Sequence, residues 1–540
     1  MTIKRRGLSA LALLAAGSLA LAGCASGETK PGSTEKPTGG SAFITTNGSE
    51  PENPLIPTNT NEVGGGKIIE QIFAGLFYYD AKGEPQKDMA ESVESSDSQN
   101  YTITIKADQT FSNGEKVTAK SFVDAWNYGA KAENNQNGQS WFQDIQGFDV
   151  NGNEDLSGLV VVDDTTFEVH LTQPVSDFEL RLGYSAYYPL PESAFADMKA
   201  FGEFPVGNGP YQIQDEKAWK HKERITLSKS ESYTGARVAQ NDGLEIVFYS
   251  TPEAGYTDLV SGNVDVLDQI PDSAMKTFQD ELGDRAVNQA SAISQTITIP
   301  ERLEHFSGEE GKLRRQAISH AINREEITKV VFADTRAPAK DFTAPVIPGY
   351  SEDIAGSEVL TFDADKAKEL WAQADAIAPW TGTFKIAYNS NGPHKSWVDA
   401  VSNQLKNNLG IDATGDAIAD FGDMRKQITS QTIQTPFRSG WQSDYPGQYN
   451  FLGPLFGTEA SANDGKYSNP AVDQLLNEGL AAASVDEGIE KFTQAQEILF
   501  QDLPAIPLWY QNAAGGYSEN VDNVQFSWNS VPLYYEVTKK

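Results

Sequence analysis

The sequence predicts an α/β protein in which strands and helices alternate along the chain. Alternating apolar residues indicate half-buried strands at 101–106 and 167–171, and apolar residues at helical spacing indicate helices between such strands. We find no fixed-period repeat and no heptads, which argues against solenoids and coiled coils. The 540 residues are too many for one hydrophobic core, so we expect two or three domains.

The first residues have the three parts of an export signal. A basic cluster at 4–6 precedes an apolar run at 8–22, and this run is too short for a stable transmembrane helix. The segment Leu21-Ala-Gly-Cys24 resembles a bacterial lipobox, which would make Cys24 the lipid-modified first residue after removal of residues 1–23. The alternative is an ordinary signal peptide with a free thiol. The paired arginines leave Sec and twin-arginine export both open.

Composition limits the partners and the chemistry. Cys24 is the only cysteine, which excludes disulfides, cysteine nucleophiles and thiolate metal sites. Lys and Arg number 42 against 75 Asp and Glu, and the formal charge of −33 is spread along the chain, which argues against nucleic acid as a partner. Residues 24–41 read as a flexible tether, and no second long apolar run follows. We therefore expect a soluble body attached to the membrane only through lipid on Cys24.

The alternation can be followed element by element. We expect a strand at 42–46, a loop at 50–61, and a core-packed helix that follows Gly64-Gly-Gly66 and ends at Gly75-Leu-Phe-Tyr-Tyr79. Thr118 can cap the next helix. The later elements are expected in this order: a tight turn into a strand at 206–213, a helix, turn and helix at 313–331, a strand at 384–388, and an amphipathic helix at 397–409.

The stretch with the most concentrated chemistry is residues 438–452. It places Arg438, Trp441 and Asp444 around Gly440 and Pro446, two residue types that disfavour regular structure, so we interpret the stretch as a ligand-facing loop. An Asp can pair with a cation, an Arg with an anion, and a Trp can supply an apolar wall, which together suit a zwitterion such as a peptide. The alternative is that Asp444 caps a turn, Arg438 is solvated and Trp441 is core.

Seven landmarks in one order resemble a known family, the oligopeptide and dipeptide type of extracellular solute-binding proteins of ABC importers (family 5 solute-binding lipoproteins). The resemblance covers nearly all of the chain after residue 23. The landmarks are the lipobox, Gly75-Leu-Phe-Tyr-Tyr79, the strand at 101–111 followed by Ser-Asn-Gly-Glu-Lys-Val-Thr-Ala119, Gly207-Asn-Gly-Pro-Tyr211, Arg315-Gln-Ala-Ile-Ser-His-Ala-Ile-Asn-Arg324, Asp363-Ala-Asp-Lys-Ala-Lys-Glu-Leu370 and Gly440-Trp-Gln-Ser-Asp-Tyr-Pro446.

The resemblance implies a two-lobed periplasmic-binding-protein fold (type II) with a hinge and an additional inserted domain in the first lobe. The chain would cross between the lobes near Ala290 and Tyr510. The implied parts are a signal peptide at 1–23, a lipid-anchored tether at 24–41, lobe one at 42–287 plus 513–540 with the inserted domain at 76–204, and lobe two at 288–512.

The resemblance also implies roles for individual residues. Asp444 would pair with the α-ammonium of a peptide, Arg438 with the carboxylate of a short peptide, and backbone groups of 440–442 with the peptide main chain. The segment at 61–64 would face them from lobe one. Family members usually continue Asp-Tyr-Pro with an acidic residue and Pro, whereas this chain has Gly447-Gln448, so the shape of the adjoining pocket is not carried over. The expected ligand-binding residues are Asp444, Arg438, Gly440, Trp441, Gln442, Tyr445, Glu62 and Val63.

We expect a monomeric cell-surface receptor that captures oligopeptides and delivers them to an ABC permease. The chain lacks the Gly-x-x-x-x-Gly-Lys-Ser/Thr motif, so the ATPase subunits must be separate proteins. No cofactor, metal site or catalytic residue is expected. The alternatives are a receptor of the same fold for an oligosaccharide or a metal chelate, and a secreted hydrolase. Hydrolysis would need a placed nucleophile or paired carboxylates, and the sequence has neither Gly-x-Ser-x-Gly nor His-Glu-x-x-His.

Overall fold

A mixed sheet of 12 strands organises residues 42–60 and 62–540, which are the residues that the structure, a computed structural model, describes. The predicted signal peptide, the tether and Cys24 lie outside the described residues. The strands follow the order β16 (Asp412–Ile418), β15 (Thr383–Asn389), β17 (Phe437–Gln442), β13 (Ala286–Thr298), β18 (Ala505–Tyr517), β12 (Val266–Leu267), β1 (Phe43–Gly48), β11 (Gly243–Phe248), β10 (Arg224–Lys229) and β8 (Tyr211–Gln212), with β14 (Arg336–Pro338) on β18 and β9 (Trp219–Lys220) on β10.

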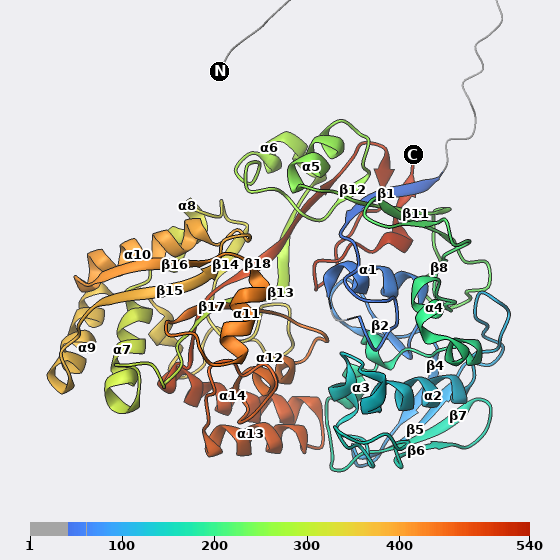
Figure 1. The fold of residues 1–540 in the computed structure, drawn as a ribbon, viewed down its shortest axis with the longest axis horizontal. Coiled ribbons are helices and arrows are strands. Elements are labelled where there is room, and N and C mark those ends of the chain that lie inside the picture. The colour runs from blue at the N-terminus through green and yellow to red at the C-terminus, as the bar shows by residue number, and fades with distance from the viewer. Residues whose placement is uncertain (1–41, 61) are drawn as a thin grey trace, which may run out of the picture. The chain divides into compact units, whose positions relative to one another are not determined.

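Two long antiparallel strands, β13 and β18, connect the two ends of this sheet (Figure 1). Each has 13 residues, and β13 also pairs with β17, while β18 also pairs with β12. The register of their pairing shifts between Gln289 and Ile293, and a residue in this bulge forms its backbone hydrogen bonds with segments other than β18. The Ala292 amide donates to the Trp528 carbonyl at 2.8 Å, and its carbonyl accepts from Ser443 at 3.0 Å. The predicted crossing points Ala290 and Tyr510 both lie in this strand pair.

The segment predicted as an inserted domain contains its own antiparallel sheet, in the order β4 (Ala90–Glu94), β5 (Asn100–Ile105), β7 (Thr166–His170) and β6 (Leu159–Val161). The helix α2 (Ala119–Ala130) packs on it because Phe122 and Trp126 both contact Phe167, with ring centroids 5.8 and 5.6 Å apart. Thr118 is the N-cap of α2, as predicted, and its amide donates to the hydroxyl of Ser121 at 3.2 Å. This segment also holds β2 (Phe77–Tyr79), β3 (Pro85–Lys87), α3 (Phe178–Arg181) and α4 (Met198–Glu203).

Helices pack along the β15–β16 end of the main sheet, where α10 contacts both strands. Trp397 of α10 lies against Trp509 of β18, with ring centroids 5.3 Å apart. No helix in the described part of the chain combines the length and hydropathy needed to cross a bilayer. The helices between β13 and β18 in the chain are α7 (Gly308–His320), α8 (Arg324–Val330), α9 (Ala364–Ile377), α10 (Lys395–Leu409), α11 (Phe421–Thr429), α12 (Gln448–Phe456), α13 (Pro470–Leu480) and α14 (Val485–Asp502).

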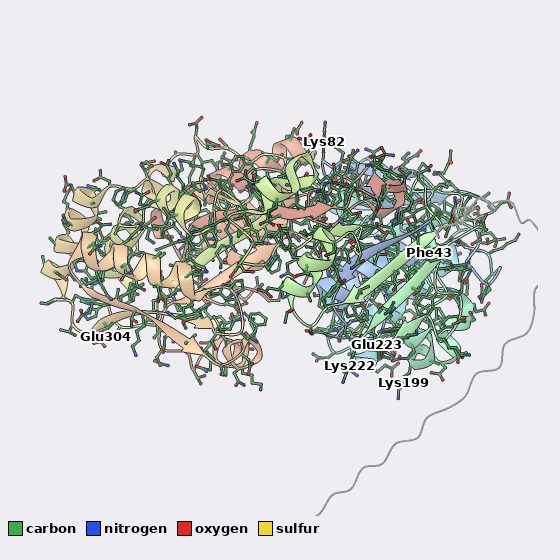
Figure 2. All side chains as sticks on the ribbon, turned by 90° about the horizontal axis from the view of Figure 1, so that it is seen from above. Phe43, Lys82, Lys199, Lys222, Glu223 and Glu304 are labelled. Carbon is green, nitrogen blue, oxygen red and sulfur yellow. The ribbon has the colours of Figure 1, made fainter. Side chains whose placement is uncertain are left out.

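The start and the end of the described chain share one core. Phe43, labelled in Figure 2, begins β1 and pairs in register with Gly243 of the parallel strand β11. The hydroxyls of Thr46 and Tyr534 are hydrogen-bonded at 3.0 Å across 488 positions of sequence. The same core includes residues of α1 (Val63–Ile72) and of β19 (Val521–Asp522), which pairs with β20 (Thr538–Lys539). The helices α5 (Pro252–Val260) and α6 (Phe278–Leu282) pack together in a separate cluster.

Two of the predicted elements are wrong. The helix predicted to follow Gly64-Gly-Gly66 begins at Val63, so it includes these glycines, and it ends at Ile72; the residues predicted as its end, 77–79, form strand β2 instead. The stretch 438–452 is not one loop, because it contains most of β17, a five-residue connection and the start of α12. β2 forms a hairpin with β3 across the short connection 80–84, whereas β17 pairs with the distant strand β13, whose hydrogen bonds local sequence does not reveal.

Candidate ligand-binding site

The connection between β17 and α12 presents Asp444, and Asn450 fixes its position. The Asp444 amide donates to Asn450 Oδ1 at 3.1 Å, and Asn450 Nδ2 donates to Asp444 Oδ2 at 3.1 Å. Asn450 Oδ1 also accepts from the indole of Trp441 at 2.9 Å. The N-cap of α12 is Gly447, so Asp444 does not cap this helix. One asparagine side chain therefore orients both the carboxylate and the indole.

Asp444 is a largely buried carboxylate without a cationic partner among the described residues. Burial raises its pKa to about 6, although hydrogen bonds from Asn450 and Tyr184 act to lower it. The Asp444 charge in turn contributes to raising the pKa of Tyr184 and Tyr79 well above the usual value, an effect due first to burial. A cation placed here would therefore meet an unpaired carboxylate between phenol rings.

A buried charge network lies immediately after Asp444. The Tyr445 hydroxyl donates to Asp177 Oδ2 at 2.6 Å, while Asp177 Oδ1 accepts from Arg181 Nη2 at 2.6 Å. Arg181 Nη1 pairs with Asp144 at 2.8 Å, and its guanidinium lies over the rings of Tyr445 and Tyr449 at 5.7 and 5.4 Å. Burial opposes the Arg181 charge, but the two carboxylates hold its pKa well above the usual range. The network ties the 443–447 connection to α3.

One edge of β17 is available for a further strand. β13 covers one edge along all six residues, from Phe437 to Gln442, whereas β15 pairs with the other edge only at Phe437. Gly440 on this strand is exposed, and a Cβ there would lie 3.0 Å from the carbonyl oxygen of Ser294. A cavity of about 150 Å³ lies beside this edge, between β17, α11 and the 462–464 segment. The free edge can accept the main chain of an extended ligand.

Arg438 is the second residue of the same strand and is half-buried. Its Nε and Nη2 both donate to Asn389 Oδ1, the former at 2.9 Å, and its guanidinium lies 4.9 Å from the ring centroid of Phe421. It forms no ion pair within the described residues, and burial together with Arg425 lowers its pKa to about 10. His394 lies nearby, where burial and the charge of Arg438 lower its pKa to about 3 and keep it neutral. Arg438 is therefore a positioned cation rather than a solvated one.

The remaining expected residues have separate surroundings. Gln442 Nε2 donates to the Asn529 carbonyl at 3.0 Å. Glu62 is the N-cap of α1, and both of its carboxylate oxygens accept from the Gly65 amide at 2.9 Å. Val63 is 61% exposed. The Glu62 side chain forms its hydrogen bonds with the amides of Glu52 and Gly65, and no hydrogen bond among the described residues joins it to β17.

Several residues close to Asp444 were missed by the sequence analysis. Tyr79 and Tyr184 come from the segment predicted as an inserted domain, and only the tertiary fold places them beside Asp444. Asn450 carried a readable signal, since it follows Asp444 by six residues in the stretch already singled out. Within residues 42–60 and 62–540, no group of three His, Cys, Asp or Glu side chains is placed to hold a metal ion.

An α/β fold built on one sheet with two long connecting strands, and with an unpaired carboxylate beside a free strand edge, defines a protein that binds a solute. The sequence pattern of the bacterial extracellular solute-binding proteins, family 5 Middle, matches residues 84–463. The chain belongs to this family, as the sequence landmarks predicted.

Relatives and solved structures agree with this assignment. The chain is 26% identical over 526 residues to the oligopeptide-binding protein OppA of Bacillus subtilis (strain 168), and 28% identical over 532 residues to the dipeptide-binding protein DppE of the same organism, with 94% of each chain covered in both cases. Haemophilus influenzae OppA in complex with RPPGFSPFR matches with a TM-score of 0.75 at 22% identity, covering 92% of this chain and 99% of that one. The Escherichia coli murein tripeptide-binding protein MppA matches with a TM-score of 0.76 at 19% identity, covering 92% and 98%. The predicted fold class, a two-lobed α/β fold of type II, is confirmed.

Proposed function

We propose that this protein is the substrate-binding lipoprotein of an ABC importer and that it captures oligopeptides between its two lobes. Lobe one would comprise 42–287 and 513–540, with 76–204 inserted, and lobe two would comprise 288–512. The peptide would pass to a membrane permease driven by separate ATPase subunits. Relatives named for oligopeptide and dipeptide binding support this choice of ligand. The protein would act as a monomer and without catalysis, anchored to the outer face of the cell membrane through Cys24.

The observation that carries this proposal is the largely buried, unpaired carboxylate of Asp444 next to a free strand edge. In the proposed complex the peptide α-ammonium binds Asp444, and main-chain groups of the peptide bind the backbone of Gly440, Trp441 and Gln442. The carboxylate of a short peptide binds Arg438. Because recognition rests on charges and main chain, side chains can enter roomy cavities, and sequence preference is then low at most positions. A sugar would leave the Asp444 carboxylate without a cation.

A double-mutant cycle between Asp444 and the peptide amine tests the proposal. Removing one partner of a buried ion pair costs about 3–5 kcal/mol, so Asp444→Ala is expected to weaken trialanine binding by roughly two to four powers of ten. N-acetylation of the peptide removes the same pair from the other side, so the two losses overlap instead of adding. Calorimetry on the four combinations of protein and peptide measures this coupling.

The matched control is Asp486→Ala, which removes an exposed carboxylate from α14 outside the site and should leave affinity unchanged. Additive losses, or equal binding of free and acetylated peptide by the wild type, would remove Asp444 from the proposed role. Release of peptide fragments during the titration would instead indicate a hydrolase.

A further inference from the structure

A second acceptor-rich pocket lies beside Asp444, between α1, β2 and the C-terminal segment. Glu70 and Gln71 of α1 line it together with Tyr78 and Tyr79 of β2. Its cavity is about 60 Å³. Since one water needs about 10–15 Å³ on the same measure, the pocket holds roughly four waters, or an ammonium or guanidinium with a short stretch of methylene chain. The rest of the wall consists of Gly183, Tyr188, Arg237, Ser527, Trp528, Asn529, Val531, Pro532, Leu533, Tyr534 and Tyr535.

The pocket presents two hydrogen-bond acceptors that lack donors. Gln71 is only 5% exposed, and its Oε1 has no hydrogen-bond partner within the described residues. The Glu70 side chain forms neither an ion pair nor a hydrogen bond with any of the described residues. Its backbone carbonyl accepts a hydrogen bond from Arg237 Nη1 at 2.7 Å. A buried acceptor without a donor, such as Gln71 Oε1, is costly, and the half-buried Glu70 carboxylate beside it also lacks a donor, so a group with N–H donors is the favoured occupant.

The cations nearest to the pocket are already neutralised by other carboxylates. Arg237 Nε donates to Asp88 at 3.0 Å, and its Nη2 donates to the Phe73 carbonyl at 2.9 Å. Lys67 pairs with Asp268. Each of these two pairs has a net charge of zero, so, among the described residues, the Glu70 carboxylate is the charge beside the pocket that no paired cation compensates. Aromatic rings on the walls further favour a cation over an anion.

The pocket and the proposed amine site are neighbours. Tyr79 lines the pocket, and the charges of both Asp444 and Glu70 contribute to raising its pKa. Gly183 also lines the pocket, while the next residue, Tyr184, is hydrogen-bonded to Asp444. A side chain that extends from the amino end of a ligand held at Asp444 is therefore the part best placed to enter the pocket.

We propose that this pocket is a subsite for a cationic side chain near the amino end of the peptide, with Glu70 and Gln71 as its acceptors. The inference rests on the proposed peptide-binding function and narrows it, because it makes one side-chain position selective for lysine or arginine over neutral residues of similar length. Val63 lies seven residues before Glu70, so two turns of α1 bring the predicted lobe-one contact and the new subsite to one helix face.

Paired peptides test the subsite. Calorimetry would compare Lys-Ala-Ala with norleucine-Ala-Ala, and Ala-Lys-Ala with Ala-norleucine-Ala, so that the two arms separate the first from the second residue. We expect the wild type to prefer lysine by tenfold or more in one arm. Glu70→Gln keeps the shape but removes the charge, and it is expected to reduce that preference to threefold or less while leaving the norleucine peptide unaffected. Gln71→Met, which replaces the whole carboxamide by a thioether of similar length and so removes the Oε1 acceptor together with the Nε2 donor, is expected to weaken the preference several-fold.

The matched control is Glu253→Gln, an exposed glutamate on α5 outside the pocket, which should keep the full preference. Equal binding of lysine and norleucine peptides by the wild type in both arms would overturn the subsite and leave peptide binding intact. Retention of the preference by Glu70→Gln would also overturn it. Failure of every peptide to bind would reject the proposed function, and the subsite with it.

The lysine preference should also depend on pH. Burial raises the pKa of Glu70 to about 7, against the lowering effect of Arg237 and Lys67, so the empty pocket is partly protonated at neutral pH. A cation binds the ionised form, and the preference is expected to grow from pH 6 to pH 8. Asp444 titrates near this range, but it affects both peptides of a pair alike because both carry an α-ammonium. The phenols around the pocket stay neutral, since the pKa values of Tyr78, Tyr79, Tyr188, Tyr534 and Tyr535 are all raised.

Discussion

At the scale of single residues, the state of Asp444 sets how binding responds to pH. Its pKa in the unliganded protein is about 6, and only the ionised carboxylate attracts an ammonium. Affinity for trialanine is therefore expected to be constant above pH 7 and to fall by about tenfold by pH 5, one unit below this pKa. Asp444→Asn should bind weakly at every pH and abolish the slope. Binding titrations from pH 5 to pH 8 measure this pH dependence. A wild-type affinity that rises on acidification would contradict the assignment of Asp444 as the ammonium-binding group.

The same carboxylate has a predictable effect on stability without ligand. The pKa is raised on folding from its usual 3.8, so the protonated form stabilises the fold, and this stabilisation is lost as pH rises through about 6. Asp444→Asn, which stays neutral, is therefore expected to be more stable than the wild type at pH 8, by at most about 3 kcal/mol, and equally stable below pH 4. Urea unfolding at the two pH values checks this, and a destabilised variant at pH 8 would show that the carboxylate already has a favourable partner.

Much of the residue-level site was accessible from sequence because its central residues are contiguous. Arg438, Gly440, Trp441 and Asp444 lie within seven positions, and the structure places all four along β17 and the connection after it. Glu70 was not accessible in this way, since its helix position predicts an ordinary solvated charge. The proposed role of Glu70 in a cation subsite depends on a pocket whose wall includes residues more than 450 positions later in the chain.

At the scale of elements, the buried network around Arg181 joins α3 to the connection after β17. Tyr445→Phe removes a hydrogen bond to a charged acceptor and is expected to cost about 1.5–3 kcal/mol. Arg181→Met leaves Asp144 and Asp177 buried without a cation and should cost about 3–5 kcal/mol. Urea unfolding of the unliganded protein measures both.

Tyr449→Phe is the matched control for this network. Its ring also lies under Arg181, but its hydroxyl has no hydrogen bond within the described residues, so the change should stay within about 0.5 kcal/mol. A loss for Tyr445→Phe as small as that for Tyr449→Phe would mean that the rings, which both variants keep, and not the Tyr445 hydroxyl, hold the two elements together.

The wrong prediction for β17 has a cause in its long-range pairing. Helices such as α7, α8 and α10 were found from their own periodicity, and the strand at 384–388 from its own alternation. In β17 the sequence Phe-Arg-Ser-Gly-Trp-Gln has no clear alternation, and its extended form depends on the ladder to β13, about 145 positions earlier.

At the scale of the whole molecule, the two-lobed fold predicts closure on binding. A ligand that contacts both lobes favours the closed arrangement, because the added contacts exist only there. Saturating trialanine is therefore expected to reduce the radius of gyration measured by small-angle X-ray scattering, and Asp444→Ala at the same peptide concentration should not change it. An unchanged wild-type curve would contradict a clamp that bends at β13 and β18.

Attachment to the membrane is expected to be separable from ligand binding. Cys24→Ser removes the proposed lipid acceptor, and the predicted tether at 24–41 lies before the first residue of the ligand-binding fold. The variant should therefore appear in the soluble fraction after cell fractionation while retaining full affinity for trialanine. Sedimentation of the variant with membranes after a salt wash would contradict the lipoprotein assignment.

The contact between Thr46 and Tyr534 has a consequence for synthesis and export. Thr46 of the first strand cannot form its contact with Tyr534 until that residue, 488 positions later, has been synthesised. At about 5–20 residues per second, synthesis of the intervening chain takes roughly 25–100 s. Long-range contacts of this kind also slow folding after release. A signal at the beginning of the chain would thus reach the export machinery well before the body can fold. In the proposed exported protein, this topology would delay folding of the body during the interval in which the chain crosses the membrane.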